Sequence, residues 1–131
     1  KVFPVWELVM DNLPDEARKI ATERVKWSRK YQRKYNITSR EASDLPNGMA
    51  PKLQHLAKRV YRILGLSGYA RIDMRLEQTG TVYVLEANPN PEIAYEEDFA
   101  DSAERAGVPY KELLHRILTT GLGWRPTDWG R

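Results

Sequence analysis

The segment GYARIDMRLEQTGTVYVLEANPNPEI, residues 68–93, constrains the fold of this chain more than any other part of it. Apolar residues alternate with polar ones on both sides of a turn that contains a glycine, which predicts two strands joined as a β-hairpin. Strands that only support a core do not need a carboxylate in each. This pair nevertheless carries Asp73 and Glu86, with Arg71 and Asn88 two residues away from them.

The register of the hairpin decides whether these side chains meet, because strand side chains alternate between the two faces of a sheet. With an even loop at 78–81, Asp73 lies opposite Glu86. Arg71 then lies opposite Asn88, whereas a loop one residue earlier places Arg71 opposite Glu86. A loop with an odd number of residues would break the cluster. On the second strand the alternation assigns four residues to one face: Val82, Val84, Glu86 and Asn88.

Two carboxylates directly across a pair of strands repel each other, so the charge between Asp73 and Glu86 must be offset. Arg71 or Arg75 could do so in a structural salt bridge, since surface ion pairs are common and weak. A divalent cation is the alternative. Two carboxylates with the amide oxygen of Asn88 form an all-oxygen set, which suits magnesium or manganese rather than zinc. So small a set leaves room for an anionic partner such as a nucleotide triphosphate, and hairpin geometry alone leaves both interpretations open.

The rest of the sequence predicts an α+β domain in which helices cover one face of an antiparallel sheet. An apolar run over 2–10 predicts a strand, and 15–35 is rich in helix formers, although part of it could be extended. Residues 36–50 are predicted as loop. We expect one domain portion over 1–123 and a loosely held tail over 124–131. Three further helices are predicted from apolar stripes at helical spacing: 51–64, 98–106 and 109–120.

Composition excludes several kinds of function. The 131 residues include no cysteine, which excludes disulfides, thiolate metal sites and cysteine catalysis and is consistent with a reducing cytosol. Only two histidines are present, too few for a multi-histidine zinc site. We find neither a run long enough to cross a bilayer nor a secretion signal, so we expect a cytoplasmic protein with no membrane partner. The net charge of +3 is uneven, with a basic first half and an acidic second half.

The hairpin resembles a known family signature. The run ARIDMRL, followed by a glycine and by VYVLEANPNPEI, is similar to the metal-binding motif of the ATP-grasp carboxylate–amine ligases, in particular the D-alanine–D-alanine ligase branch. The resemblance implies that Asp73 and Glu86 hold Mg²⁺ (or Mn²⁺), with Glu86 bridging two ions and Asn88 on the second. It also implies that Arg71 contacts the transferring phosphoryl group and the acyl phosphate. The fold implied is the C-terminal subdomain of an ATP-grasp domain.

What the resemblance implies for function is an ATP-dependent ligase that forms C–N bonds. Such an enzyme phosphorylates a small-molecule or peptide carboxylate with ATP, and an amine then displaces phosphate. The family's glycine-rich phosphate loop, adenine hinge and N-terminal domain lie upstream of the motif, and nothing resembling them occurs here. We therefore expect the C-terminal part of a longer parent chain, inactive alone and completed by upstream ATP-grasp subdomains. The run Asn-Pro-Asn-Pro-Glu at 88–92 replaces the usual Asn-Thr-Ser-Pro-Gly, which leaves the acceptor substrate in doubt.

A second candidate region is the basic segment RKIATERVKWSRKYQRK, residues 18–34. Aromatic residues interleave with its lysines and arginines, so residues 18–35 could bind nucleic acid through phosphate contacts and stacking, the less favoured alternative. The default interpretation is a solvated helix whose aromatics pack on the domain. A third follows the resemblance: Lys26-Trp27 is similar to a lysine–aromatic pair facing the nucleotide, with Lys26 on a triphosphate oxygen. A non-catalytic ATP-grasp-like nucleotide-binding domain is a further alternative.

Overall fold

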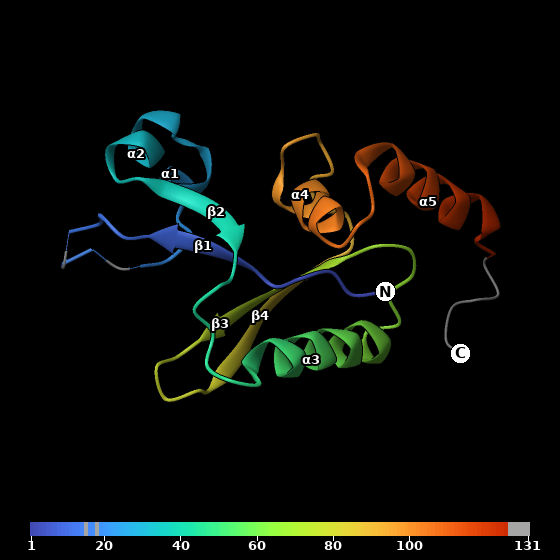
Figure 1. Ribbon diagram of the computed structural model, residues 1–131, viewed down its shortest axis with the longest axis horizontal. Coiled ribbons are helices and arrows are strands. Elements are labelled where there is room, and N and C mark those ends of the chain that lie inside the picture. Colours follow the sequence, from blue (N-terminus) through green and yellow to red (C-terminus); the bar gives the residue numbers. More distant parts are fainter. Residues whose placement is uncertain (15, 18, 126–131) are drawn as a thin grey trace. The chain divides into compact units, whose positions relative to one another are not determined.

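The computed structural model divides the chain into two compact units, which we describe separately (Figure 1). The larger consists of Lys1–Val5 together with Ser43–Arg131, and the smaller is Trp6–Ala42. The predicted α+β class is confirmed, since both units combine a two-stranded antiparallel sheet with helices. The structure describes these parts of the chain: 1–14, 16–17 and 19–125. The predicted tail lies outside the described residues from 126 onward.

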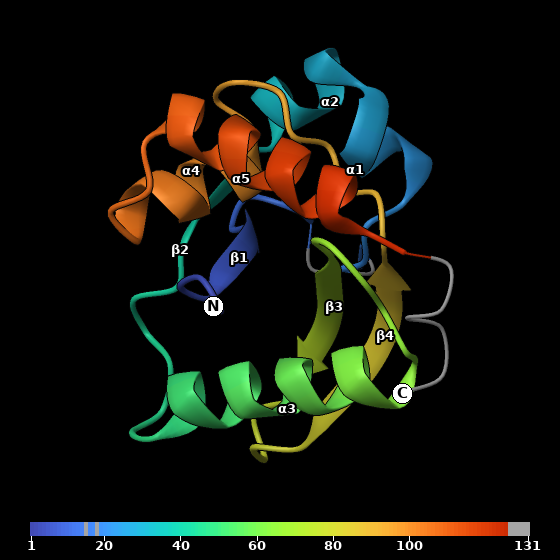
Figure 2. The same cartoon turned by 90° about the vertical axis from the view of Figure 1, so that its right-hand side faces the viewer.

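The larger unit is built on the predicted hairpin. Strand β3 (Arg71–Leu76) pairs antiparallel with β4 (Val82–Asn88). Three helices accompany the hairpin: α3 (Met49–Ile63), α4 (Asp98–Arg105) and α5 (Tyr110–Gly123). In Figures 1 and 2 the hairpin separates α3 from the neighbouring pair of α4 and α5. The three predicted helices are thus confirmed, with ends that differ by up to three residues from the sequence prediction.

The core of the larger unit lies where α4 and α5 meet. Gly107 permits the tight connection between them, because its backbone has φ +74°, a conformation that costs other residues more. The next amide, that of Val108, donates to Ala103 O at 2.9 Å and ends α4. The buried side chains are Ala100, Ala103, Val108 and Leu113, and four partly buried residues pack on them: Phe3, Phe99, Tyr110 and Ile117.

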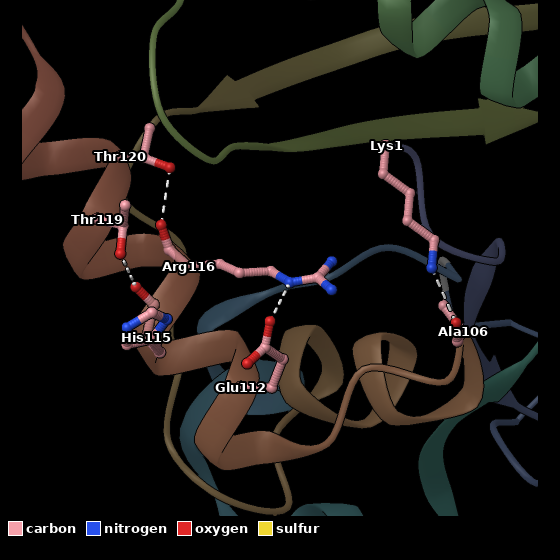
Figure 3. A network of polar contacts seen from close by, with 7 residues as sticks. All are labelled: Lys1, Ala106, Glu112, His115, Arg116, Thr119 and Thr120. Carbon is pink, nitrogen blue, oxygen red and sulfur yellow. Dashed lines mark hydrogen bonds and ion pairs between the residues drawn. The ribbon is translucent and has the colours of Figure 1, made fainter.

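Several polar side chains of α5 are exposed and bond within the helix (Figure 3). Arg116 donates to Glu112 at 2.8 Å, an exposed pair one helical turn apart. The hydroxyls of Thr119 and Thr120 donate back to carbonyls one turn earlier in the helix. Within the described residues, no helix combines the length and the apolar character that a membrane span requires.

The smaller unit is a two-stranded sheet with two short helices between its strands in the sequence (Figure 1). Strand β1 (Trp6–Met10) pairs along its length with β2 (Ile37–Glu41). The helices are α1 (Glu23–Trp27) and α2 (Arg29–Lys34). Among the described residues of this unit, four apolar side chains are buried: Val9, Leu13, Val25 and Ile37.

Two sequence predictions for the strands of the smaller unit were wrong: the start of β1 and the loop over 36–50. The strand predicted over 2–10 begins only at Trp6, because the preceding residues bond within the larger unit: Ser102 Oγ donates to Pro4 O at 3.0 Å. The loop predicted over 36–50 contains β2. Only Ile37 of that strand is buried, so its sequence shows little apolar alternation.

The helix predicted over 15–35 is interrupted rather than continuous. Ser28 has extended backbone angles and accepts a hydrogen bond from the Tyr31 amide at 3.3 Å, so it caps α2 and separates it from α1. Thr22 caps α1 in the same way through the Val25 amide. Hydroxyl side chains that bond to nearby amides compete with continuous helix, which explains the break. Residues 15 and 18 lie outside the described residues.

We predict that Leu113→Ala lowers the free energy of unfolding by about 2–4 kcal/mol, because Leu113 is 3% exposed and its loss leaves a cavity. Leu114→Ala, a neighbour on the same helix that is 37% exposed, should cost less than about 1 kcal/mol. Urea denaturation of the two variants measures both values. Equal costs would contradict the placement of the core at the contact between α4 and α5.

Candidate metal and nucleotide site

The hairpin places the two carboxylates directly opposite each other. Asp73 pairs with Glu86, and Arg71 pairs with Asn88 at the adjacent outer position. Directly opposed residues share a face of the sheet, so the geometric requirement of the sequence-based hypothesis is met. The predicted pairing of these four residues therefore agrees with the structure.

The turn that produces this register differs from the prediction. The strands are joined by five residues, 77–81, and not by the even loop 78–81. The Glu77 amide closes this turn by donating to Thr81 O at 2.9 Å. An odd loop was expected to break the cluster, but the register shifts between Asp73 and Met74. Leu85 is the extra residue of β4 at that point, a β-bulge that restores the pairing of Asp73 with Glu86.

The bulge also changes the faces of β4. Val84 pairs with Met74 and Val82 pairs with Leu76, so these valines lie on the apolar face of β3. Glu86 lies on the opposite face with Asp73. The prediction that Val82, Val84, Glu86 and Asn88 share one face was therefore wrong, because strict alternation along β4 is interrupted at Leu85, which is 66% exposed.

Arg71 neutralises Asp73. Its Nε donates to Asp73 Oδ1 at 2.7 Å, and Nη2 donates to Oδ2 at 2.9 Å, a bidentate ion pair between half-buried side chains. This hydrogen-bonded pair raises the pKa of Arg71 above its usual value. Burial opposes the shift, while the charges of Asp73, Asp98 and Glu86 add to it. The structural salt bridge considered from the sequence is thus present, with Arg71 as the partner of Asp73.

The exit of β4 holds Asn88 in a defined orientation. Its Oδ1 accepts a hydrogen bond from the Asn90 amide at 2.9 Å. The prolines on both sides of Asn90 restrict its backbone further. Beyond them, Glu92 Oε1 accepts from the amides of Ile93 and Ala94, so that side chain bonds to its own loop.

One residue near the site is not part of the sequence-based hypothesis. Tyr69 donates its hydroxyl to Asn90 Oδ1 at 2.9 Å. The residue type alone allows both packing and hydrogen bonding, since a tyrosine combines an apolar ring with a polar end. The contact depends on the approach of the β3 entry to the β4 exit, which the sequence pattern does not specify.

The donor set fits a hard divalent cation that keeps other ligands. Asp73 and Glu86 supply carboxylate oxygens and Asn88 supplies an amide oxygen, a combination suited to Mg²⁺ bound together with phosphate and water. Within the described ranges, no cluster of three or more His, Cys, Asp or Glu side chains forms a larger candidate centre. Arg71 engages both oxygens of Asp73, so a cation there would have to displace at least one of these contacts.

Lys26 belongs to the smaller unit, on α1, and is exposed. Trp27 beside it is 80% exposed, whereas Tyr31 and Tyr35 are partly buried, with ring centroids 4.6 Å apart. The default interpretation of packed aromatics therefore holds for the two tyrosines and fails for Trp27. The break at Ser28 means that these aromatics do not line one helix.

Comparison with known proteins places the chain in a family. The family model of the D-ala D-ala ligase C-terminus matches residues 11–119. D-alanine–D-alanine ligase from Lactobacillus acidophilus is 35% identical over 96 residues, 70% of this chain and 27% of that protein. D-alanine–D-alanine ligase A from Bacillus cereus is 35% identical over 94 residues, 70% of this chain and 31% of that protein.

A solved structure agrees with these matches. The D-alanine–D-alanine ligase of Bacillus anthracis complexed with ATP superimposes with a TM-score of 0.57 at 33% identity, over 63% of this chain and 28% of that one. The chain thus spans about three tenths of the length of such relatives.

We predict that Arg71→Gln lowers the free energy of unfolding by about 1 kcal/mol at low salt, because Asp73 and Glu86 then face each other without the Arg71 guanidinium. The loss should shrink in about 1 M salt, which screens charges over a few ångströms. Urea denaturation at the two salt concentrations measures the effect.

Arg116→Gln is the matched control, since it breaks the exposed pair with Glu112 on α5 and leaves the hairpin intact (Figure 3). It should change stability only slightly at either salt concentration. A cost for Arg71→Gln that is the same at low and high salt would contradict repulsion between the two carboxylates.

Proposed function

Since the chain belongs to the family of D-alanine–D-alanine ligase C-terminal domains, we propose that it supplies the cation- and phosphate-binding strands of an ATP-dependent carboxylate–amine ligase. The single observation that carries the proposal is the register of β3 and β4, which aligns Asp73 with Glu86 and Arg71 with Asn88. Those four residues are the ones that the motif predicts for the site. The remaining parts of the active site would come from upstream subdomains of a longer parent chain.

ATP is the proposed nucleotide, because the superimposed relative is described as complexed with it. Mg²⁺, or Mn²⁺ in its place, is the proposed metal, and Asp73, Glu86 and Asn88 are its proposed ligands. When bound, the metal supplies positive charge that offsets the charge of the transferring phosphoryl group. The carboxylates provide no nucleophile here; their role is to hold that charge at a fixed place.

Arg71 is the proposed phosphoryl ligand. Its planar guanidinium pairs with a carboxylate through two hydrogen bonds in the structure, and it can pair with phosphate oxygens in the same way. Arg71 would then leave Asp73 when nucleotide and cation enter and bind the phosphoryl oxygens instead. The substrate carboxylate takes up the γ-phosphoryl group of ATP to form an acyl phosphate, and ADP leaves. The amine then attacks the acyl carbon, phosphate leaves, and the nitrogen loses a proton as the amide forms. Positioning and charge neutralisation account for this role.

The substrates are proposed by class only: a small-molecule or peptide carboxylate and an amine. The loop after β4 differs from the Asn-Thr-Ser-Pro-Gly run of D-alanine–D-alanine ligases. Glu92, which stands in place of its glycine, bonds to the amides of the following two residues. We infer that the acceptor side of the site differs from that of D-alanine–D-alanine ligases.

Lys26 is the proposed second phosphate contact, on the smaller unit. Its exposed ammonium and the exposed ring of Trp27 are available to a nucleotide. Nucleic-acid binding by 18–35 gains no support from the family match, and the break at Ser28 divides the basic face that it requires. The proposed compartment is the cytoplasm, where ATP and Mg²⁺ are available.

We predict that Asp73→Asn in the full-length parent lowers Mg²⁺-dependent ATP turnover by at least about 100-fold, because a site that stabilises transferring charge loses one of its carboxylates. Glu77→Gln, which removes an exposed acid of the hairpin turn, should leave turnover unchanged. Phosphate release measured across Mg²⁺ concentrations compares the variants. Full activity of Asp73→Asn would exclude the metal assignment.

We also predict that Lys26→Ala raises the KM for ATP about tenfold, the cost of one charge-assisted hydrogen bond. Lys30→Ala, an exposed lysine on α2, serves as the control and should leave KM near the parent value. Steady-state kinetics with varied ATP measures both. If the two variants behave alike, Lys26 does not contact the triphosphate.

A further inference from the structure

A chain of contacts leads from the core of the larger unit to Asn88. The Tyr69 ring packs on Phe99, with centroids 5.6 Å apart. Phe99 in turn contacts Phe3 edge-on at 5.6 Å, and both phenylalanines pack against the buried cluster of α4 and α5. The ring of Tyr69 is therefore anchored to the core, while its hydroxyl reaches the exit of β4.

The hydrogen-bonded part of this series of contacts involves Asn90. Tyr69 Oη donates to Asn90 Oδ1 at 2.9 Å, and the Asn90 amide donates to Asn88 Oδ1 at 2.9 Å. Asn90 thus uses its side chain toward Tyr69 and its backbone toward Asn88. Pro89 and Pro91 restrict φ on either side of Asn90. A movement of Asn90 would therefore mainly change the orientation of the Asn88 side-chain amide.

We propose that Tyr69 and Asn90 are positioning residues that orient the Asn88 amide oxygen and so set the affinity of the site for its divalent cation. This inference rests on the proposed function, because it takes Asn88 as a ligand. An amide oxygen has two lone pairs. The Asn90 backbone amide occupies one lone pair of Asn88 Oδ1. The second lone pair then points in a fixed direction and is available to a cation. Groups that hydrogen-bond to a metal ligand and fix its orientation affect how tightly the metal binds.

The position of these bonds favours an orienting role over a stabilising one. Both hydrogen bonds are solvent-exposed, and exposed hydrogen bonds contribute little net stability because water replaces them. Losing the Tyr69 hydroxyl should therefore change the geometry at Asn88 far more than the free energy of unfolding. The anchored ring, which Tyr69→Phe retains, carries the contribution to packing.

The test uses the full-length parent with Tyr69→Phe. Mn²⁺ binding in the presence of a non-hydrolysable ATP analogue, followed by the electron paramagnetic resonance of free Mn²⁺, should weaken about tenfold. Hydrogen exchange of the Asn90 amide should become faster, and the flanking prolines isolate this signal because they have no amide hydrogen. The midpoint of thermal unfolding should stay near that of the unsubstituted protein.

Two comparisons sharpen the result. Tyr110→Phe alters another tyrosine of the same core, whose ring packs edge-on against Tyr95 at 5.3 Å, and should change neither binding nor exchange. Asn90→Ala breaks the same contact as Tyr69→Phe from the other side. The double variant should therefore bind Mn²⁺ as weakly as either single variant, without an additive loss.

The outcomes that overturn the proposal are distinct from those that overturn the proposed function. Unchanged Mn²⁺ affinity in Tyr69→Phe, with weaker affinity in Asn88→Ala, overturns the positioning role alone. So does additive weakening in the double variant. If Asn88→Ala and Asp73→Asn also leave Mn²⁺ affinity unchanged, the cation site is wrong and both proposals fall.

Discussion

The structure of the candidate site depends on one electrostatic constraint, the placement of Asp73 directly opposite Glu86 on neighbouring strands. Like charges in that position are unfavourable, and Arg71 relieves the repulsion by pairing with both oxygens of Asp73. The same arrangement explains why the residues suit the proposed chemistry. In the proposed function, a metal ion and an anionic nucleotide take over this neutralisation together, and the guanidinium passes from carboxylate to phosphate.

The bulge at Leu85 makes this arrangement compatible with an apolar face on the same hairpin. A five-residue turn sets Leu76 opposite Val82 and Met74 opposite Val84, which places the valines on the apolar face of β3. Without an extra residue, that register would not set Asp73 opposite Glu86. One bulge therefore lets a single hairpin pair apolar side chains near its turn and charged side chains near its open end. Such bulges are common beside functional sites, where they redirect side chains.

The hairpin and its helices could be predicted from the sequence, because alternation, apolar stripes and turn glycines are local signals. The hairpin pattern also predicted that Asp73 lies opposite Glu86 and Arg71 opposite Asn88, in agreement with the register. Three features depended on non-local balances and could not be predicted: the odd turn offset by Leu85, the strand β2 with only Ile37 buried, and the approach of Tyr69 to Asn90. The break at Ser28 was a local signal that helix propensity concealed, since a serine can cap a helix as well as continue one.

The most direct measurement of the central claim is a crystal structure of the full-length parent with Mn²⁺ and a non-hydrolysable ATP analogue, with the metal located by its anomalous scattering. We predict an anomalous peak within bonding distance of Asp73 and Glu86, and an Arg71 guanidinium that has left Asp73 for a phosphate oxygen. A peak elsewhere, with Arg71 still paired to both oxygens of Asp73, would contradict it and leave the pair as a structural salt bridge.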